Sequence, residues 1–434
     1  MSRYKAYPEY RDSGVEWLGP LPSHWGAKRL GQFFDERREK VSDEDYPALS
    51  VTMQGIVPQL ETAAKTDAGD NRKLVLKNDF VINSRSDRKG SSGVSTYDGS
   101  VSLISIVMTP RNIHPPFVHH LLRSYPFQEE FYRYGKGIVA DLWSTNSSEM
   151  RNILIPDMPT SEQANIAEFL DHETAKIDAL IEKQQRLIEL LKEKRQAVIS
   201  HAVTKGLNPN APMKDSGVEW LGEVPEHWDL QPLKYLCAFS GGGTPSKDNL
   251  SYWSDGTIPW VSPKDMKSFW INDSQDKITP AAVQGSSTNF VDAGSLLIVV
   301  RSGILQRTIP IAINTVPVTL NQDMKALSFI SGMDVEFAAN FILGNIPALL
   351  LEWSKEGATV ESIEHEYLSS SVFPVPPYAE QVKINATIRK RMESFDALEQ
   401  QASTGITLLQ ERRIALISAA VTGKIDVRDW QAGA

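Results

Sequence analysis

Two segments, at residues 162–206 and 380–424, repeat one another at a constant offset of 218 positions without a gap. They read "EQANIAEFLDHETAKIDALIEKQQRLIELLKEKRQAVISHAVTKG" and "EQVKINATIRKRMESFDALEQQASTGITLLQERRIALISAAVTGK". Within each segment, positions seven residues apart are mostly apolar, which is the spacing of a coiled-coil seam. The seam residues are Leu170, Ile177, Gln184, Leu191 and Val198 in the first copy and Ile388, Phe395, Ala402, Leu409 and Leu416 in the second. We expect each copy to form one long helix, which at ~1.5 Å per residue is a rod of roughly 67 Å.

The middle of each predicted helix carries an irregularity. Gln184 is polar in the first seam, and Gly405 weakens the second helix near the equivalent place. A polar seam residue can fix the register and orientation of a coiled coil at a cost in stability. An antiparallel pair of helices would bring the two midpoints together, so this orientation is the one we expect.

A shorter repeat precedes each helix. "DSGVEWLG" occurs at residues 12–19 and 215–222, each time followed by Pro, one residue and His-Trp. The spacing of Ser13 and Glu16 predicts a capping box on one short helical turn, which Gly19 would end. Two tryptophans per copy favour a segment that packs against the rest of the protein. We call residues 12–25 and 215–228 the first and second clasp, and we interpret His24 and His227 as packing residues because no companion metal ligands lie nearby.

The regions between clasp and helix are rich in short runs of β-branched residues separated by Gly, Pro, Asn and Asp, which favours strands. The sequence therefore predicts an α+β protein with two strand-rich domains and two long antiparallel helices, related by an internal pseudo-twofold repeat. The predicted segments are residues 1–157 (first domain with its clasp), 158–205 (first long helix), 206–377 (second domain with its clasp) and 378–434 (second long helix and tail).

Composition limits the kind of protein. The single cysteine, Cys237, excludes an internal disulfide framework and a cysteine-based zinc site. Long apolar runs and an N-terminal signal pattern are missing, so we expect a cytoplasmic protein without a membrane partner. Residues 206–377 contain 10 Lys+Arg against 19 Asp+Glu, the opposite of the basic surface expected of a protein that binds DNA unaided.

Motifs for catalysis are weak. "VPPY" at Val375–Tyr378 is similar to the loop by which amino-methyltransferases hold a target base, but Val375 cannot accept a hydrogen bond from an amino group. "SGGGTPS" at Ser240–Ser246 lacks the Gly-Lys-Ser/Thr ending of a phosphate-binding loop. The pattern favours a binding protein over an enzyme.

Three features together resemble the DNA specificity subunit of type I restriction-modification systems. They are the paired clasps, the run "FSGGGTPSK...YW...GTIPWVSPKDM" from Phe239 to Met266, and the two helices ending in "AVISHAVTKG" and "ALISAAVTGK". The resemblance covers nearly the whole chain and is weakest in the first variable domain.

This resemblance implies a non-catalytic subunit that binds double-stranded DNA. Each variable domain would be a target recognition domain for one half of a split target sequence, and the paired helices would act as a ruler for the gap. Two modification subunits, which carry S-adenosylmethionine and the methyltransferase chemistry, would dock on the chain. Restriction subunits, which use ATP and Mg²⁺, would join them. No cofactor or metal is expected in this chain itself.

An approximate alignment of the two halves predicts the residues that contact DNA. Arg85-Ser86 and Arg301-Ser302 each end a strand-like run, and arginine can bond guanine or grip a phosphate, while Asn and Gln suit adenine. For each residue the alternative is an ordinary surface position or a salt bridge. The predicted DNA-binding residues are Arg85, Ser86, Arg88, Lys89, Thr244, Ser246, Lys264, Arg301, Ser302, Asn321 and Gln322.

Two other functions remain open. A chain with its own methyltransferase activity would bind S-adenosylmethionine alone, and the missing Gly-rich loop argues against that activity. An assembly scaffold that has lost DNA recognition would explain the acidity of residues 206–377. DNA binding with and without modification subunits would distinguish a scaffold from a DNA reader.

Overall fold

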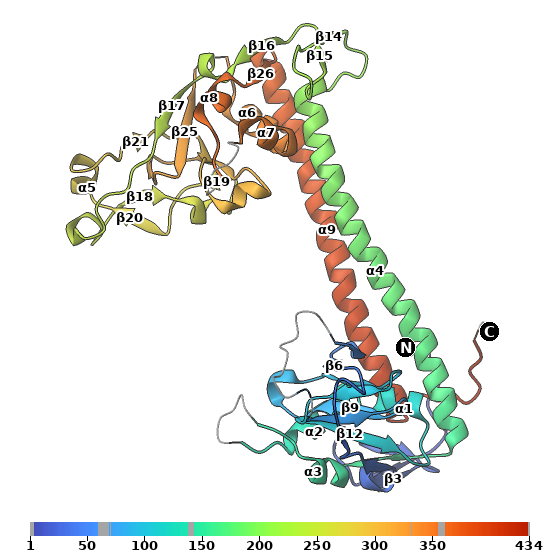
Figure 1. Cartoon of the computed structure of the whole chain (residues 1–434). Helices are drawn as coiled ribbons and strands as arrows, with labels where there is room; N and C mark the ends of the chain where they lie inside the picture. The colour runs from blue at the N-terminus through green and yellow to red at the C-terminus, as the bar shows by residue number, and fades with distance from the viewer. Residues whose placement is uncertain are drawn as a thin grey trace. The chain divides into compact units, whose positions relative to one another are not determined.

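The computed structural model describes residues 4–59, 69, 71–137, 143–330, 332–354 and 361–432. Its contacts divide the chain into two compact units. Unit 1 comprises residues 1–185 and 403–434, and unit 2 comprises residues 186–402. Each unit therefore combines one strand-rich domain with one part of each long helix (Figure 1).

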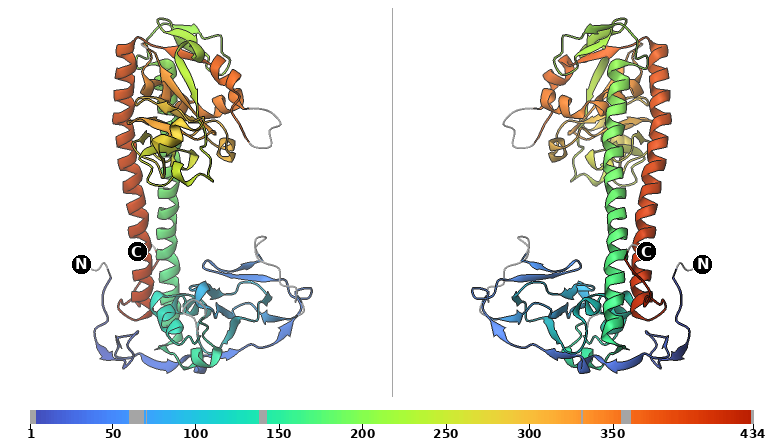
Figure 2. Two further views of the ribbon diagram at one scale, coloured as in Figure 1. Left: turned by 90° about the vertical axis from the view of Figure 1, so that its left-hand side faces the viewer. Right: turned by 90° about the vertical axis from the view of Figure 1, so that its right-hand side faces the viewer.

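Each repeated segment forms a single helix, as predicted. Helix α4 spans Thr160–Lys205 and helix α9 spans Tyr378–Val421. All ten predicted seam residues are buried or half-buried, Gln184 included. Within each unit the two helical parts lie side by side and run in opposite directions (Figures 1 and 2). Glycines in the left-handed conformation follow both helices, Gly206 (φ +74°) and Gly423 (φ +69°), as is common at helix C-termini.

The clasps pack into the fold, but the predicted capping box of Ser13 and Glu16 does not form. The Ser13 hydroxyl accepts the N–H of Val15 at 3.1 Å, and Glu16 lies 3.5 Å from Arg133. The single turn is held by the Val15 carbonyl, which accepts the N–H of Gly19 at 3.0 Å. Gly19 has a φ of +61°, so glycine ends the turn as expected.

Helix ends hold both clasps. In unit 1 the Lys424 ammonium donates to the carbonyls of Leu18 (3.2 Å) and Pro20 (2.6 Å). In unit 2 Lys205 donates to the equivalent carbonyls, those of Leu221 (3.2 Å) and Glu223. The first clasp is thus held by Lys424, three residues after α9, and the second clasp by Lys205, the last residue of α4.

The strand-rich domain of unit 1 has a four-stranded antiparallel sheet in the order β10-β9-β12-β4. A second sheet has the order β11-β8-β5, and three strand pairs complete the unit. The strands are β1 (Tyr10–Asp12), β2 (Pro20–Pro22), β3 (Gly26–Arg29), β4 (Phe34–Glu36), β5 (Lys40–Val41), β6 (Leu49–Thr52), β7 (Gly55–Pro58), β8 (Arg72–Val75), β9 (Phe80–Asn83), β10 (Ser92–Val94), β11 (Gly99–Val101), β12 (Ser105–Pro110) and β13 (Leu154–Asp157). The short helices are α1 (Pro115–Leu121), α2 (Tyr125–Arg133) and α3 (Ser147–Asn152).

Unit 2 repeats the main sheet of unit 1 although the two sequences share little, but its second sheet differs. Its main sheet has the order β23-β22-β25-β17, which matches β10-β9-β12-β4 strand for strand, with β19 added at the β23 edge. A second sheet has the order β20-β18-β24-β21. The strands are β14 (Met213–Asp215), β15 (Glu223–Pro225), β16 (Asp229–Pro232), β17 (Cys237–Gly241), β18 (Ile258–Val261), β19 (Trp270–Ile271), β20 (Asp276–Ile278), β21 (Phe290–Val291), β22 (Leu296–Val299), β23 (Ile311–Asn314), β24 (Val318–Leu320), β25 (Met324–Phe329) and β26 (Val372–Val375). The helices are α5 (Pro280–Gln284), α6 (Val335–Gly344), α7 (Ile346–Trp353) and α8 (His365–Ser370).

A hydrophobic core in each unit joins clasp, sheet and helices. Trp25 of the first clasp and Trp228 of the second are both fully buried. In unit 1 the core includes Phe169 of α4, and in unit 2 it includes Ile388 of α9. Burial of such large side chains contributes about 1.5–3 kcal/mol each, so the clasps are part of the fold's stability.

Candidate nucleic-acid interface

The loop after β9 carries four of the predicted DNA-binding residues. The Asn83 side chain accepts the N–H of Arg85 at 3.1 Å, and the N–H of Ser86 donates to the Trp143 carbonyl at 3.0 Å. A short 3-10 helix from Ser86 to Arg88 follows. The backbone therefore holds the Arg85 side chain at the end of a buried strand, where it is exposed.

The loop after β22 in unit 2 is built in the same way. The N–H of Ser302 donates to the Glu361 carbonyl at 3.1 Å, and Arg301 pairs with Ser362 as Arg85 pairs with Ser144. A 3-10 helix, Gly303–Gln306, follows, with the Ser302 hydroxyl at its N-terminus. The predicted equivalence of the two Arg-Ser pairs is confirmed as a structural equivalence.

The two arginines differ from the other predicted cations in their ion pairing. Lys89 contacts Glu129, Arg88 lies 3.8 Å from Asp87, and Lys264 lies 2.6 Å from Asp276. The hydrogen bond with Asp276 raises the pKa of Lys264. Within the part of the chain that the structure describes, neither Arg85 nor Arg301 has an ion-pair partner. Both guanidinium groups are therefore available to a ligand.

In unit 2 most of the predicted DNA-binding residues lie close together at one end of the strands of the main sheet. Val299 pairs with Met324, and Gly241 pairs with Lys325. Because neighbouring antiparallel strands alternate in direction, the segments that follow β17 and β22 and the one that precedes β25 lie at the same edge. These segments carry Thr244, Ser246, Arg301, Ser302, Asn321 and Gln322.

Close contacts shape this edge. The Thr244 hydroxyl contacts the Gln322 side-chain oxygen, and the Trp260 indole N–H donates to the Gly243 carbonyl at 2.9 Å. A Cβ at Gly242 would lie 1.9 Å from the Asn321 carbonyl oxygen, so glycine is required there for close approach of the backbone. The Asn321 side-chain oxygen accepts the N–H of Asp323 at 2.6 Å, which leaves its amide NH₂ for other contacts. Ser246 is exposed, with its carbonyl bonded to the Trp253 indole at 3.0 Å.

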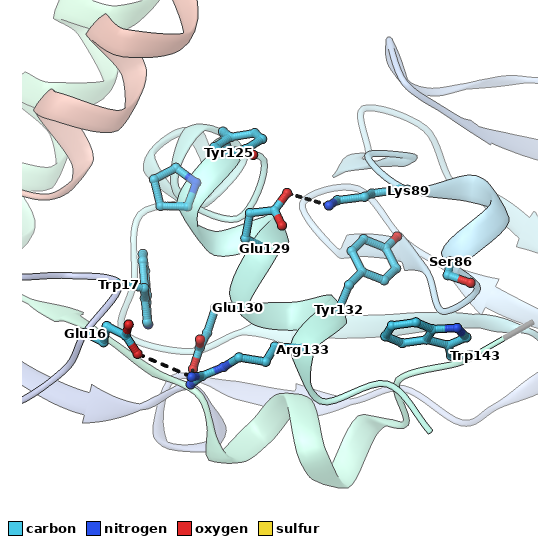
Figure 3. A pocket seen from close by; sticks show the side chains of 11 residues that line it. Glu16, Trp17, Ser86, Lys89, Tyr125, Glu129, Glu130, Tyr132, Arg133 and Trp143 are labelled. Atoms are coloured by element: carbon cyan, nitrogen blue, oxygen red, sulfur yellow. Dashed lines mark hydrogen bonds and ion pairs between the residues drawn. The ribbon is translucent and has the colours of Figure 1, made fainter. Parts of the chain in front are cut away.

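A cavity of about 710 Å³, which no sequence motif predicts, lies beside the Arg85 loop (Figure 3). Ser86 and Lys89 line it together with four aromatic side chains. The Lys89 ammonium lies 5.9 Å from the centre of the Tyr132 ring, a favourable cation–π distance. Burial raises the pKa of Tyr132 to about 12. The aromatic lining residues are Trp17, Tyr125, Tyr132 and Trp143. Their sequence spacing carries no period that could have revealed the cavity.

In the described ranges, no group of three or more His, Cys, Asp or Glu side chains is arranged to hold a metal ion. No single described helix is long and apolar enough to cross a membrane. Helices α6 and α7, which are bent by 88° at the break between them, are together long and apolar enough for a span, and their residues Phe337, Phe341 and Leu349 are buried in the core of unit 2.

Comparison with known proteins shows similarity to type I specificity subunits. A family model described as "Type I restriction modification DNA specificity domain" matches residues 225–408. The chain is similar to the EcoR124I/EcoR124II type I restriction enzyme specificity subunit of Escherichia coli, with 32% identity over 296 residues. Residues 225–408 thus resemble the DNA specificity domain of type I restriction-modification systems, and most of the chain is similar to a type I specificity subunit. This alignment covers 67% of the chain and 65% of the relative, slightly less than two thirds of the relative's length.

Solved structures show that the specificity-family fold extends over nearly the whole chain. One neighbour, described as "Structural basis underlying complex assembly and conformational transition of the type I R-M system", has a TM-score of 0.70 and 15% identity, and covers 92% of this chain and 98% of its own. The HsdS subunit from Thermoanaerobacter tengcongensis has a TM-score of 0.56 and 16% identity, and covers 93% and 98%. The predicted α+β class, with two strand-rich domains and two long helices, is confirmed.

Proposed function

We propose that this chain is the non-catalytic subunit that reads a two-part DNA target for a type I restriction-modification complex. The observation that carries the proposal is the pair Arg85 and Arg301. Each is exposed and has no ion-pair partner among the described residues, and each follows an equivalent strand, β9 or β22, of main sheets with the same strand order. One such arginine per domain suits one DNA contact per half-site, because arginine can bond the guanine edge or a phosphate.

The long helices are proposed to set the gap between the half-sites. Both α4 and α9 are continuous, and their repeat keeps the offset of 218 throughout. A rod of constant length is what a fixed spacing along the duplex requires, as subunit geometry sets half-site spacing in other DNA-binding proteins.

Exposed leucines support the docking of two copies of one partner. Leu180 and Leu408 of unit 1 are 46% and 59% exposed, while the equivalent residues of unit 2, Leu398 and Leu190, are both 45% exposed. Exposed apolar side chains on a helix face are typical of interaction surfaces. Two equivalent leucine pairs on a duplicated frame fit two identical modification subunits, and restriction subunits would join through them.

The remaining parts of the proposal concern chemistry and location. S-adenosylmethionine, ATP and Mg²⁺ would bind to the partner subunits, and this chain would need no cofactor. The complex would act in the cytoplasm, where it meets DNA. This chain would thus recognise the target sequence in DNA, and its partners would carry out the reactions.

Domain exchange tests the proposed reading of split DNA. Residues 20–157 would be replaced by the corresponding domain of a relative with another target, and the methylated sites of the reconstituted complex would be sequenced. One half-site should change, while the other half-site and the gap should stay the same. A change in both half-sites would contradict one-domain-per-half reading.

A scaffold without DNA recognition is the second candidate, and the excess of acidic residues in 206–377 favours it. Gel-shift titration separates the two functions. A DNA reader should bind weakly alone and tightly, with sequence preference, once modification subunits are added. A scaffold would assemble with the same partners and show no preference for any sequence.

A further inference from the structure

A cationic cavity lies on the helix pair of unit 2, apart from the predicted DNA-contacting loops. Its volume is about 410 Å³, and Lys194, His201 and Arg391 line it over an apolar floor that includes Val198 and Ile388. None of the described lining residues is acidic. Over the described ranges, Lys194, His201 and Arg391 also have no ion pair or hydrogen bond through their side chains. The cavity therefore offers the positive charges of Lys194 and Arg391 and the imidazole of His201 above an apolar surface.

The equivalent place in unit 1 is filled by the chain itself. Positions Thr387 and Arg391 of the cavity correspond to Phe169 and Glu173, at the offset of 218. The Tyr4 ring lies 5.1 Å from the Phe169 ring, and its hydroxyl donates to Glu173 at 2.9 Å. The Trp430 ring lies 5.5 Å from Phe169. Two aromatic side chains, one from each terminal segment, thus cover this part of the unit 1 helix pair.

Chain connectivity explains the difference between the two units. In unit 1 the segment before the clasp and the segment after α9 are separate, and together they bring Tyr4 and Trp430 to the helices. In unit 2 the chain runs directly from α4 through Gly206 to the second clasp, so one short connection takes the place of two segments. The connection supplies Leu207 and Pro209 to the lining but no aromatic ring.

We propose that this cavity binds two neighbouring side chains of a partner subunit. One is aromatic or large and apolar, and the other carries a carboxylate. The apolar part follows from unit 1, where aromatic rings occupy the equivalent place. The carboxylate follows from the exchange of Glu173 for Arg391, because an acid that accepts a hydrogen bond is replaced by a cation that donates one. This inference rests on the proposed function, since the partner is a docked modification subunit.

The cavity fits a protein segment better than the DNA backbone. A phosphate needs donors and charge but gains nothing from an apolar floor, whereas Val198, Ala202, Leu207 and Ile388 form much of this lining. Because unit 1 is already filled, only one of two docked partner copies would meet such a cavity. The two docking events should therefore differ in affinity.

The test uses the full chain with its modification subunits and measures complex composition by native mass spectrometry. The variants are Lys194→Glu with Arg391→Glu, and separately Ala197→Trp, which places a ring in the cavity from an exposed lining position. The matched control is Arg412→Glu, at the unit 1 position equivalent to Lys194. We expect both cavity variants to weaken binding of the second partner copy by about tenfold or more, so that a one-to-one complex accumulates, while the control binds two copies.

Each other outcome has a definite meaning. If both folded cavity variants bind two copies as the unaltered chain does, the cavity proposal is wrong and the proposed function stands. If the unaltered chain binds no modification subunit, the proposed function itself fails. If the variants assemble normally but bind DNA more weakly, the cavity contacts phosphate, which also overturns the proposal. Since Ala197→Trp leaves all charges in place, it decides the question even if the charge reversal prevents folding.

Discussion

Arg413 of α9 forms a two-point ion pair with Asp178 of α4, with guanidinium-to-carboxylate distances of 2.8 and 3.2 Å. The same pair recurs in unit 2, where Arg195 of α4 contacts Asp396 of α9. Asp178 and Asp396 are equivalent in the repeat, as are Arg195 and Arg413. The duplicated ion pair therefore marks the antiparallel register in both units. In unit 1 the arginine lies on α9 and the aspartate on α4, and in unit 2 the two helices exchange these roles.

The first prediction is that this ion pair contributes to register. Reversing one charge with Arg413→Asp should lower the free energy of unfolding by about 1 kcal/mol, because two carboxylates would then face each other on a partly exposed surface. Adding Asp178→Arg should restore most of that loss. Urea unfolding followed by circular dichroism measures both, with Arg412→Asp as the exposed control. If the double variant were no more stable than Arg413→Asp alone, the two residues would not interact in solution.

The helices were predictable from sequence because their signal is periodic and long. A seven-residue apolar spacing leaves one face to bury, and Leu170, Leu191 and Ile388 are indeed buried on it. The capping box failed because Ser13 has a closer donor, the N–H of Val15. A serine followed by a tight turn bonds two residues ahead, and the sequence alone does not decide between that turn and a helix start.

The second prediction concerns pH and His119 in α1. The Arg123 guanidinium donates to Nε2 of His119 at 2.6 Å, and burial, with the nearby charge of Arg123, lowers the pKa of His119 to about 3. The unfolded chain takes up this proton near the ordinary value of about 6.5. Stability from this group is therefore fully present above pH 6.5 and is lost as the pH falls from 6.5 towards 3.

This loss should appear as a slope in the free energy of unfolding. One proton contributes up to about 1.4 kcal/mol per pH unit in that window. In His119→Asn, which keeps an acceptor without titrating in this range, the slope between pH 6 and pH 4 should be shallower by that amount. Urea unfolding at a series of pH values measures it. Parallel slopes for the variant and the unaltered chain would show that His119 is protonated in the folded state.

The third prediction separates the two half-sites. Arg85→Ala should weaken binding of the assembled complex to its target by about 10- to 100-fold and relax the sequence preference in one half only, because a good arginine–base contact is worth ~1–3 kcal/mol. Arg301→Ala should do the same in the other half. Binding measured against targets randomised in each half would show this. Arg38→Ala is the control, since Arg38 is 74% exposed and paired with Glu36.

The candidate interface was predictable only in part. Arg85 and Arg301 follow strand-like runs, so their place at a sheet edge could be inferred from an alignment of the halves. The ion pairing could not be inferred from sequence, because Lys89 contacts Glu129 of α2, which is 40 positions away in the sequence. The aromatic cavity beside Ser86 likewise joins Trp17 to Trp143, and contacts of that range follow from the fold and not from local pattern.

The last prediction concerns helix length. On α4, Asp178 and Arg195 are 17 residues apart, and on α9 the same number separates Asp396 from Arg413. An insertion in one helix alone would make these spacings unequal, so both duplicated ion pairs could no longer form in one register. A four-residue insertion between Gln184 and Leu187 should therefore be matched by one between Ala402 and Gly405.

Four residues add ~6 Å of helix, and stacked base pairs rise ~3.4 Å each. The matched insertion should lengthen the unread gap by one or two base pairs and leave the bases of both half-sites unchanged, as read from methylated sites. The insertion in α4 alone serves as the comparison. It should be less stable than the matched insertion, because the two duplicated ion pairs can then no longer form in the same register. If the folded matched variant kept the original gap, the helices would connect the domains without setting their spacing on DNA.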